Sequence, residues 1–170
     1  MFYKDPIQIL IKKGLVVGEN FHMQKYAIID YSHCWHIKIG NDVTLAPRVH
    51  ILAHDASTKI HLNHAKIGKV KIGDRVFIGA GSIILPGVTI GDDVIIGAGS
   101  IVSRDIPDGQ VAVGNPAKII CSLEEFLDKR KKEMDIYPCF GKEYTEKWNV
   151  TKGMKEEMNK KIKDKIGFIV

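Results

Sequence analysis

The side chains of this chain that are best suited to chemistry lie between residues 54 and 71. This segment, HDASTKIHLNHAKIGKVK, holds His54, His61 and His64 together with four lysines, and Asp55 is its only acid. A neutral imidazole can remove a proton from a hydroxyl or an amine near neutral pH, so each histidine is a candidate general base. A loop histidine is also commonly just an exposed polar residue. Asp55 directly follows His54, but neighbouring residues on an extended chain point apart, so Asp55 is not expected to orient it.

The elements that must position this segment repeat every six residues. From Ile72 to Pro107 the chain reads IGDRVF, IGAGSI, ILPGVT, IGDDVI, IGAGSI and VSRDIP, and the segment from Ile39 to Ala53 keeps the same period. This period fits neither an alternating strand nor a helix, and it indicates short strands joined by corners, three of which close a triangular coil. Stiff β-branched side chains open each hexad and can stack in a narrow core. They are Ile72, Ile78, Ile84, Ile90, Ile96 and Val102.

Two further hexad positions support the coil. Position two is mostly glycine, which we expect at the corners, where the backbone takes conformations that are costly for other residues. Position five is small or β-branched and is expected to point inward: Val76, Ser82, Val88, Val94, Ser100 and Ile106. The spacing from Ile39 to Ile72 is not a multiple of six, so the segment from His54 to Lys71 is expected to leave the coil as a loop. Insertions in repeat proteins collect on a working face.

Composition indicates one modest domain that binds a small ligand. The chain has 170 residues, 45% of them hydrophobic, and a formal charge of +5 that is spread along its length. This mild charge favours a small anionic ligand over nucleic acid. Three cysteines without zinc or disulfide spacing suit a reducing compartment. Lys4 and Asp5 come early and the first apolar run is short, so we expect neither a signal peptide nor a membrane span, and a cytoplasmic protein.

Helices are expected at both ends of the coil. Residues 7–13 favour a short helix, and residues 14–30 are expected to begin the coil irregularly. After VGNPAKII the period of six ends, and Ser122 with Glu125 forms a capping box ahead of a helix that Tyr137 and Pro138 stop. A second helix is expected around four apolar residues at four-residue spacing, Met154, Met158, Ile162 and Ile166. Both apolar stripes are interpreted as packing surfaces.

These features together resemble a known family. The hexads and the phrases LAPRVHILAHDAST, ILPGVTIGDDVIIGAGSIVSRDIP and VGNPAKII are similar to the left-handed β-helix acyltransferases, the hexapeptide-repeat family that uses acetyl-CoA. Within it the chain resembles the maltose and galactoside type and, in HDASTK, capsular polysaccharide O-acetyltransferases. The resemblance implies an all-β left-handed parallel β-helix over residues 1–120, with a protruding loop at 54–71. Residues 121–170 are expected to form a C-terminal helical extension that packs on the coil or on a neighbouring subunit.

The resemblance also implies an activity and its residues. Acetyl-CoA would donate an acetyl group directly to a hydroxyl or amine of a sugar, a sugar nucleotide or a polysaccharide precursor, with His54 as general base and no metal. The backbone N–H of Ala80 would stabilise the oxyanion. The residues implied for the cofactor are Ala80, Ala98, Ser103, Arg104 and Lys118, and a basic residue usual in the family's tail is replaced by Cys121. Those implied for the acceptor are Gln24, Asp30, His33 and Arg48.

The assembly and two alternatives complete the interpretation. The family forms trimers with active sites between subunits, which the flat faces of a triangular coil allow. One alternative is a zinc enzyme resembling the γ-class carbonic anhydrases, with ligands drawn from His50, His54, His61 and His64. The other is a noncatalytic hexapeptide-repeat scaffold. The sequence does not identify the acceptor, and it leaves open O- or N-acetylation and an acyl group other than acetyl.

Overall fold

The structure is a computed structural model that describes residues 6–163 and 165–170. Lys4 and Asp5, used above to argue against a signal peptide, lie outside these residues. The chain divides into two compact units, one ending at Leu123 and the other spanning Glu124–Val170. Among the described residues, no helix has both the length and the apolar character needed to cross a bilayer.

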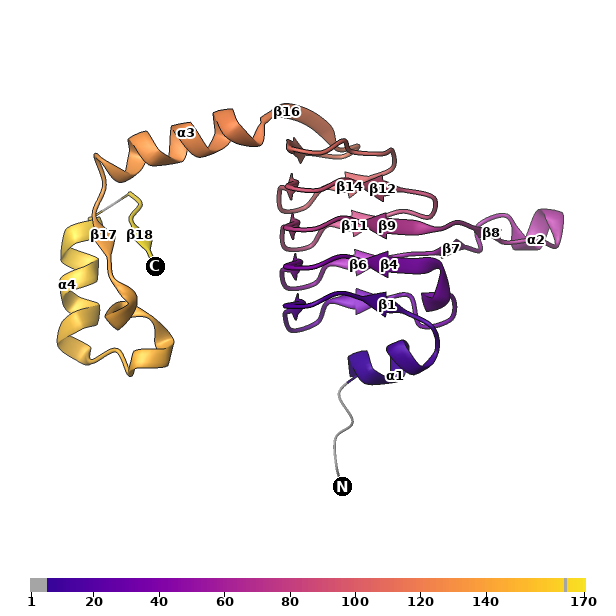
Figure 1. The fold of residues 1–170 in the computed structure, drawn as a ribbon, viewed down its shortest axis with the longest axis horizontal. Coiled ribbons are helices and arrows are strands. Elements are labelled where there is room, and N and C mark those ends of the chain that lie inside the picture. The colour runs from indigo at the N-terminus through magenta and orange to yellow at the C-terminus, as the bar shows by residue number, and fades with distance from the viewer. Residues whose placement is uncertain (1–5, 164) are drawn as a thin grey trace, which may run out of the picture. The chain divides into compact units, whose positions relative to one another are not determined.

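The first unit is a triangular coil of short parallel strands, shown in Figure 1 as stacked rungs. The chain passes in turn through three sheets. Sheet A contains β1 (Val16–Val17), β4 (Ile37–Ile39), β9 (Val70–Ile72) and β12 (Thr89–Ile90). Sheet B contains β2 (His22–Met23), β5 (Thr44–Leu45), β10 (Phe77–Ile78), β13 (Ile95–Ile96), β15 (Gln110–Val113) and the antiparallel β16 (Lys118–Ser122). Sheet C contains β3 (Ile28–Ile29), β6 (His50–Ile51), β11 (Ile83–Ile84) and β14 (Ile101–Val102). The predicted left-handed parallel β-helix is confirmed.

The core of the coil is built from hexad positions one and five, as predicted. All six position-one residues from Ile72 to Val102 are buried, and so are the six position-five residues, including Ser82 and Ser100. The two serines remain satisfied inside because each Oγ donates a hydrogen bond to the carbonyl of Gly97, at 3.0 and 2.6 Å. Burial of polar groups without such partners would cost free energy. The core of the coil is therefore a stack of aliphatic side chains that includes two serine hydroxyls bonded to the backbone.

Glycine occupies hexad position two for a different reason from the one expected. None of the four adopts a positive φ; instead a Cβ on Gly79 would lie 2.5 Å from the backbone nitrogen of Ala98 on the next coil. Glycine is required at these positions because successive coils approach closely. The corner conformations with positive φ fall at position four, as at Arg75 (φ 55°), Gly81 (φ 70°) and Asp93 (φ 56°). The prediction that position two carries the costly corner conformation was wrong by two residues.

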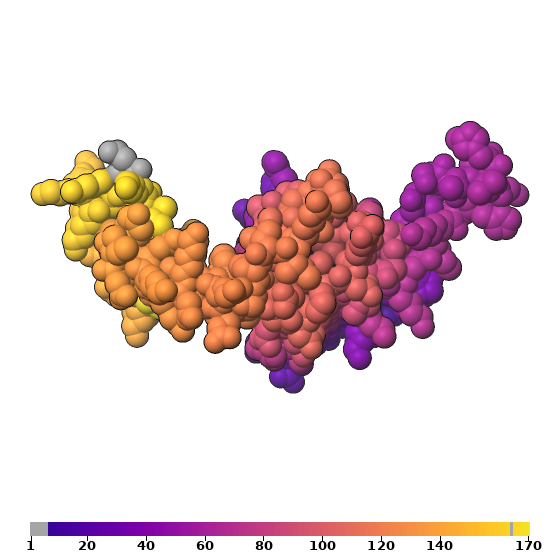
Figure 2. All heavy atoms as spheres, turned by 90° about the horizontal axis from the view of Figure 1, so that it is seen from above, coloured from indigo at the N-terminus to yellow at the C-terminus, as the bar shows by residue number. Residues whose placement is uncertain are grey.

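The protruding loop is confirmed. It is an antiparallel hairpin of β7 (His54–Asp55) and β8 (Lys66–Ile67) that carries the short helix α2 (Lys59–Leu62) at its tip. Figure 2 shows it standing away from the body of the coil. The chain rejoins the coil at β9, where Val70 is fully buried, so the loop ends just before the predicted Lys71.

The N-terminal lead-in is more regular than expected. Helix α1 (Pro6–Lys12) confirms the predicted short helix. β1, β2 and β3 pair in register with β4, β5 and β6, so residues 16–29 form a full coil. The irregularity lies after them, where η1 (Cys34–His36) interrupts the path to β4. Cys34 is fully buried there.

The second unit contains both predicted helices, α3 (Leu123–Met134) and α4 (Lys152–Ile162). The expected second apolar stripe is interrupted, because α4 ends at Ile162 and Ile166 lies beyond it. The Oγ of Thr151 caps α4 by accepting a hydrogen bond from the N–H of Met154. The sequence did not predict the parallel pair β17 (Cys139–Phe140) and β18 (Phe168–Ile169), nor the 3₁₀ turns η2 (Lys142–Tyr144) and η3 (Glu146–Trp148).

Candidate active site

Two insertions leave the coil at the same corner, between sheet C and sheet A. Equivalent residues on regular coils lie 18 apart, as in the pair Ile72 and Ile90. The pair Val17 and Ile39 is 22 apart, and the pair Ile39 and Ile72 is 33 apart. The extra residues follow β3 in the first case and β6 in the second. The two irregular segments are therefore stacked on adjacent coils, which brings residue 30 next to residue 54.

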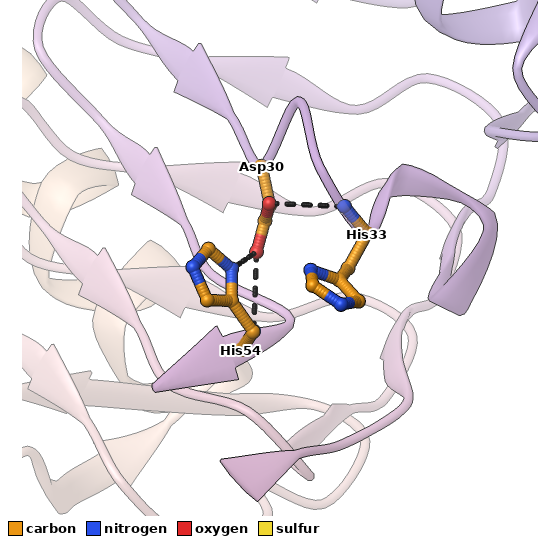
Figure 3. Close-up of side chains that lie close together, drawn as sticks. All are labelled: Asp30, His33 and His54. Carbon is orange, nitrogen blue, oxygen red and sulfur yellow. Dashed lines mark hydrogen bonds and ion pairs between the residues drawn. The ribbon is translucent and has the colours of Figure 1, made fainter. Parts of the chain in front are cut away.

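Asp30 and His54 form a hydrogen-bonded pair at this corner. His54 Nδ1 lies 2.5 Å from Asp30 Oδ2, and Figure 3 shows the imidazole facing the carboxylate. The Asp30 side chain is 1% exposed and that of His54 is 33% exposed. The carboxylate is thus held inside while part of the imidazole meets solvent.

The backbone holds the Asp30 carboxylate in place. Oδ2 accepts hydrogen bonds from the N–H groups of Ala53 and His54, at 3.0 and 3.1 Å, besides the bond from the ring. Oδ1 accepts from the N–H and Oγ of Ser32 and from the N–H of His33. Burial opposes ionisation, but the hydrogen bonds from His54, Ala53, Ser32 and His33 outweigh it and lower the pKa of Asp30 to about 2. The carboxylate is therefore ionised at neutral pH.

This pairing fixes what the imidazole can do. A carboxylate that is ionised only accepts hydrogen bonds, so His54 Nδ1 must carry the proton that lies between them. The other ring nitrogen, Nε2, then has a free lone pair in the neutral imidazole and can accept a proton from a substrate. Asp55, in contrast, accepts from the N–H of Ser57 at 2.8 Å and makes no hydrogen bond to the ring. The pair has the chemistry of a general base with an orienting carboxylate.

The family resemblance implied Asp30 as an acceptor residue and did not pair it with His54. The structure places it instead behind the imidazole, with both oxygens occupied by protein donors. The signal that was available is the spacing between coils. Had the phase of residues 16–29 been continued, the insertion after β3 would have been seen to begin at the same corner as the hairpin.

His33 is the third member of this cluster. Its ring centroid is 4.7 Å from that of His54, and the rings are inclined by 35°. Asp30, His33 and His54 each offer a ligand atom within 4.8 Å of the others, and within the described chain they are the sole group of three such residues that could hold a metal ion. The four histidines named for the zinc alternative are not brought together: His50 lies on sheet C, while His61 and His64 lie on the hairpin.

The donor set of this cluster argues for a hydrogen-bonded pair more than for a metal centre. Asp30 already accepts three hydrogen bonds at each oxygen, which use the lone pairs that a cation would need. A metal would have to displace the ring proton and the backbone donors.

The other predicted residues divide between two corners. Ala80 and Ala98 lie at the corner between sheet B and sheet C, on successive coils, because β10 pairs with β13. Both are exposed. Arg48 and Gln24 follow β5 and β2 at this same corner, on the coils below. These residues are consequently at a different corner of the coil from His54.

Ser103 and Arg104 lie instead at the corner of His54. They follow β14, which pairs with β11, which in turn pairs with β6. Both are exposed, two coils from the level of His54. Lys118 is exposed at the start of β16, opposite Val113. One chain therefore does not bring all the predicted cofactor residues together with His54.

Comparisons with known proteins agree with this fold. Residues 69–104 match the model of the bacterial transferase hexapeptide family, described as six repeats. Protein CapG of Staphylococcus aureus is 45% identical over 117 residues, covering 66% of this chain and 63% of CapG. A maltose O-acetyltransferase from Clostridium difficile 630 superposes with a TM-score of 0.57 at 44% identity, over 64% of this chain and 59% of that one. The predicted resemblance to the hexapeptide-repeat acyltransferases is confirmed.

A further similar solved structure is a complex with coenzyme A. It is a galactoside acetyltransferase, 27% identical, with a TM-score of 0.56, and the match covers 74% of this chain and 76% of that one. The chain spans less than two thirds of the length of curated relatives such as CapG.

Proposed function

We propose that this protein is an acetyl-CoA-dependent acetyltransferase that acts on a hydroxyl or amine of a sugar, a sugar nucleotide or a glycan precursor. The observation that carries the proposal is the pair of His54 and Asp30 on a hexapeptide-repeat coil. The maltose O-acetyltransferase and the galactoside acetyltransferase among its structural relatives support the donor and the acceptor class.

The proposed reaction is a direct transfer. His54 Nε2 takes the proton of the acceptor hydroxyl as its oxygen attacks the thioester carbonyl. Asp30 keeps the ring in the required tautomer and stabilises the imidazolium that forms. The backbone N–H of Ala80 stabilises the oxyanion. The C–S bond then breaks, and the proton held on His54 passes to the departing CoA sulfur.

We propose that the working form is a homotrimer with shared sites. The outward residues of sheet C are mostly apolar, Ile28, Ile83 and Ile101 beside His50, whereas those of sheet A include Lys38 and Lys71.

Sheet C lies between the two corners that hold the predicted site residues. Three copies that turn this face toward a common axis would therefore bring the His54 corner of one copy against the Ala80 corner of the next. This arrangement accounts for the separation of the base from Ala80 and Ala98 within one chain. In it, Ser103, Arg104 and Lys118 serve CoA binding, and Gln24, His33 and Arg48 are placed near the acceptor.

The test of the activity measures CoA release from acetyl-CoA with a panel of sugars, sugar nucleotides and amino sugars. We expect turnover on at least one acceptor, its loss in His54→Ala with CoA binding retained, and wild-type turnover in His61→Ala, a matched change on the exposed hairpin. No turnover and no CoA binding, together with stoichiometric zinc by elemental analysis, would replace the proposal with the metal alternative. The absence of turnover, of CoA binding and of bound zinc would favour the noncatalytic scaffold.

The test of the shared site is complementation. His54→Ala and Ala98→Trp subunits are each expected to be inactive, the second because the indole fills the space of the donor. Random mixed trimers are expected to recover about one quarter of wild-type activity, since one site in four draws an intact His54 and an intact Ala98 from different subunits. No recovery in mixed trimers, or a fully active monomer in analytical ultracentrifugation, would reject the shared site.

A further inference from the structure

A short aromatic cluster extends from His54 along the insertion that follows β3. The ring of His33 lies 4.7 Å from that of His54, and the ring of Trp35 lies 5.4 Å from that of His33, measured between centroids. His36 contacts Trp35 at 5.7 Å. Two successive ring contacts thus connect the proposed base to a tryptophan.

The backbone at Trp35 is anchored by its neighbours, although the Trp35 side chain itself is half exposed. Cys34, the preceding residue, is fully buried and its Sγ contacts the carbonyl of Leu10, which anchors η1 to helix α1. A Cβ on Gly14 would lie 2.9 Å from the Cβ of Trp35, so the glycine makes room for this side chain. Trp35 nevertheless leaves 50% of its surface exposed. A large, rigid apolar surface next to a polar site is typical of ligand-binding positions.

The neighbouring Tyr31 is a weaker candidate for ligand contact. It is 62% exposed, but the ammonium of Lys13 lies 3.5 Å from its ring centroid and donates a hydrogen bond to its carbonyl. One face of the tyrosine is therefore occupied by a cation from the chain itself. Of these two aromatic residues, Trp35 is the one connected to His54 through His33.

We propose, on the basis of the proposed function, that Trp35 is an acceptor-binding residue that stacks on the apolar C–H face of a sugar ring whose hydroxyl is directed to His54. His33 would lie between them and contact the polar edge of the same ring. A sugar presents C–H groups on its faces and hydroxyls at its rim, so an indole removes the former from water while histidines meet the latter. The acceptor class is thus a pyranoside rather than a small aliphatic alcohol or amine.

Kinetics on Trp35→Ala and Trp35→Phe test this proposal. For Trp35→Ala we expect KM for the acceptor to rise about tenfold, as follows from losing roughly 50 Å² of apolar contact. KM for acetyl-CoA and kcat should change little, and Trp35→Phe should restore most of the affinity. Trp148→Ala, which removes the other tryptophan from the second unit, is the matched control and should leave all constants unchanged. An acceptor KM in Trp35→Ala equal to that of the wild type would overturn the proposed stacking of the sugar on Trp35 while leaving the acetyltransferase function intact.

A binding measurement keeps the two proposals separable. In Trp148→Phe the sole remaining tryptophan is Trp35, so its fluorescence reports its own surroundings. We expect titration with maltose, a methyl galactoside or a UDP-sugar to change this emission saturably for at least one ligand, without any turnover being required. Glycerol and ethanolamine, which lack a ring, should not. If no sugar changes the emission, the proposed stacking on Trp35 is rejected even where acetyl transfer is observed. If a sugar binds but no acetyl transfer occurs, the stacking on Trp35 stands and the proposed function fails.

Discussion

Replacing Asp30 by asparagine removes one charge and keeps the shape of the side chain. Each carboxylate oxygen accepts three hydrogen bonds, so the NH₂ of an asparagine faces three donors whichever way the amide is turned. If the NH₂ faces His54, the ring must accept at Nδ1 and carry its proton on Nε2, where it cannot take a proton from a substrate. If it faces the other way, the N–H groups of Ser32 and His33 lose their acceptor.

The expected size of the effect follows from these contacts. Unsatisfied donors in a buried place should lower the free energy of unfolding by about 2–4 kcal/mol. Loss of the correct tautomer and of the countercharge should lower kcat by about 10²-fold to 10³-fold, most of what a general base supplies. KM for acetyl-CoA should stay the same, because Asp30 lies behind the imidazole.

The assay is CoA release at saturating substrates, combined with urea unfolding to measure how much of the protein is folded. Asp55→Asn is the matched control, since it makes the same chemical change one residue from His54 on a carboxylate that bonds to Ser57. We expect it to retain near-wild-type kcat. If folded Asp30→Asn works within about threefold of the wild type, or equals Asp55→Asn, Asp30 does not orient a catalytic base.

Three further predictions concern stability. Because the pKa of Asp30 is lowered from 3.8 to about 2, its ionised form contributes about 2 kcal/mol above pH 4 that is lost as the pH falls toward 2. Between pH 7 and pH 3, urea unfolding of the wild type should show about half of this loss, about 1 kcal/mol, and an equal loss in Asp30→Asn would contradict it. Gly73→Ala places a Cβ 2.7 Å from the backbone of Gly91 and should cost about 2–4 kcal/mol. Gly87→Asn, at φ 94° with nothing within 4 Å, should cost about 1 kcal/mol or less. If thermal unfolding shows Gly87→Asn to be more destabilising than Gly73→Ala, the close spacing of the coils is not the reason for glycine at position two. Arg75→Met removes the exposed ion pair with Asp93 and should leave the midpoint of the same urea titration unchanged, because exposed ion pairs contribute little to stability; a clear fall in the midpoint would contradict it.

The sequence predicted the parts of the fold that depend on repetition. Ile78 and Ile84 are buried because each stacks on its equivalent one coil away, and that relation is visible as a period of six. The antiparallel hairpin inside residues 54–71 and the pair β17 and β18 depend on contacts between different segments, which no period reveals.

The candidate site could be predicted only in part for the same reason. His54 was identified from the resemblance of its surrounding phrase. Its partner Asp30 lies in a neighbouring coil, and the two meet because insertions of different length begin at one corner. Trp35 was missed because an isolated aromatic residue in an irregular segment has no pattern, and its value comes from the rings beside it.

The placement of both insertions at one corner separates two kinds of change in this molecule. The stacked aliphatic core and the Ala80 corner are constrained coil by coil, since each residue there must match the coil above and below. Residues 31–36 and 55–66 carry no such constraint, since they lie outside the three stacked sheets of the coil. An exchange of residues 31–36 between relatives would therefore alter the proposed acceptor contacts of His33 and Trp35 while the corner that holds Ala80 and Ala98 stays as it is, which makes this insertion a natural place for substrate preference to diverge.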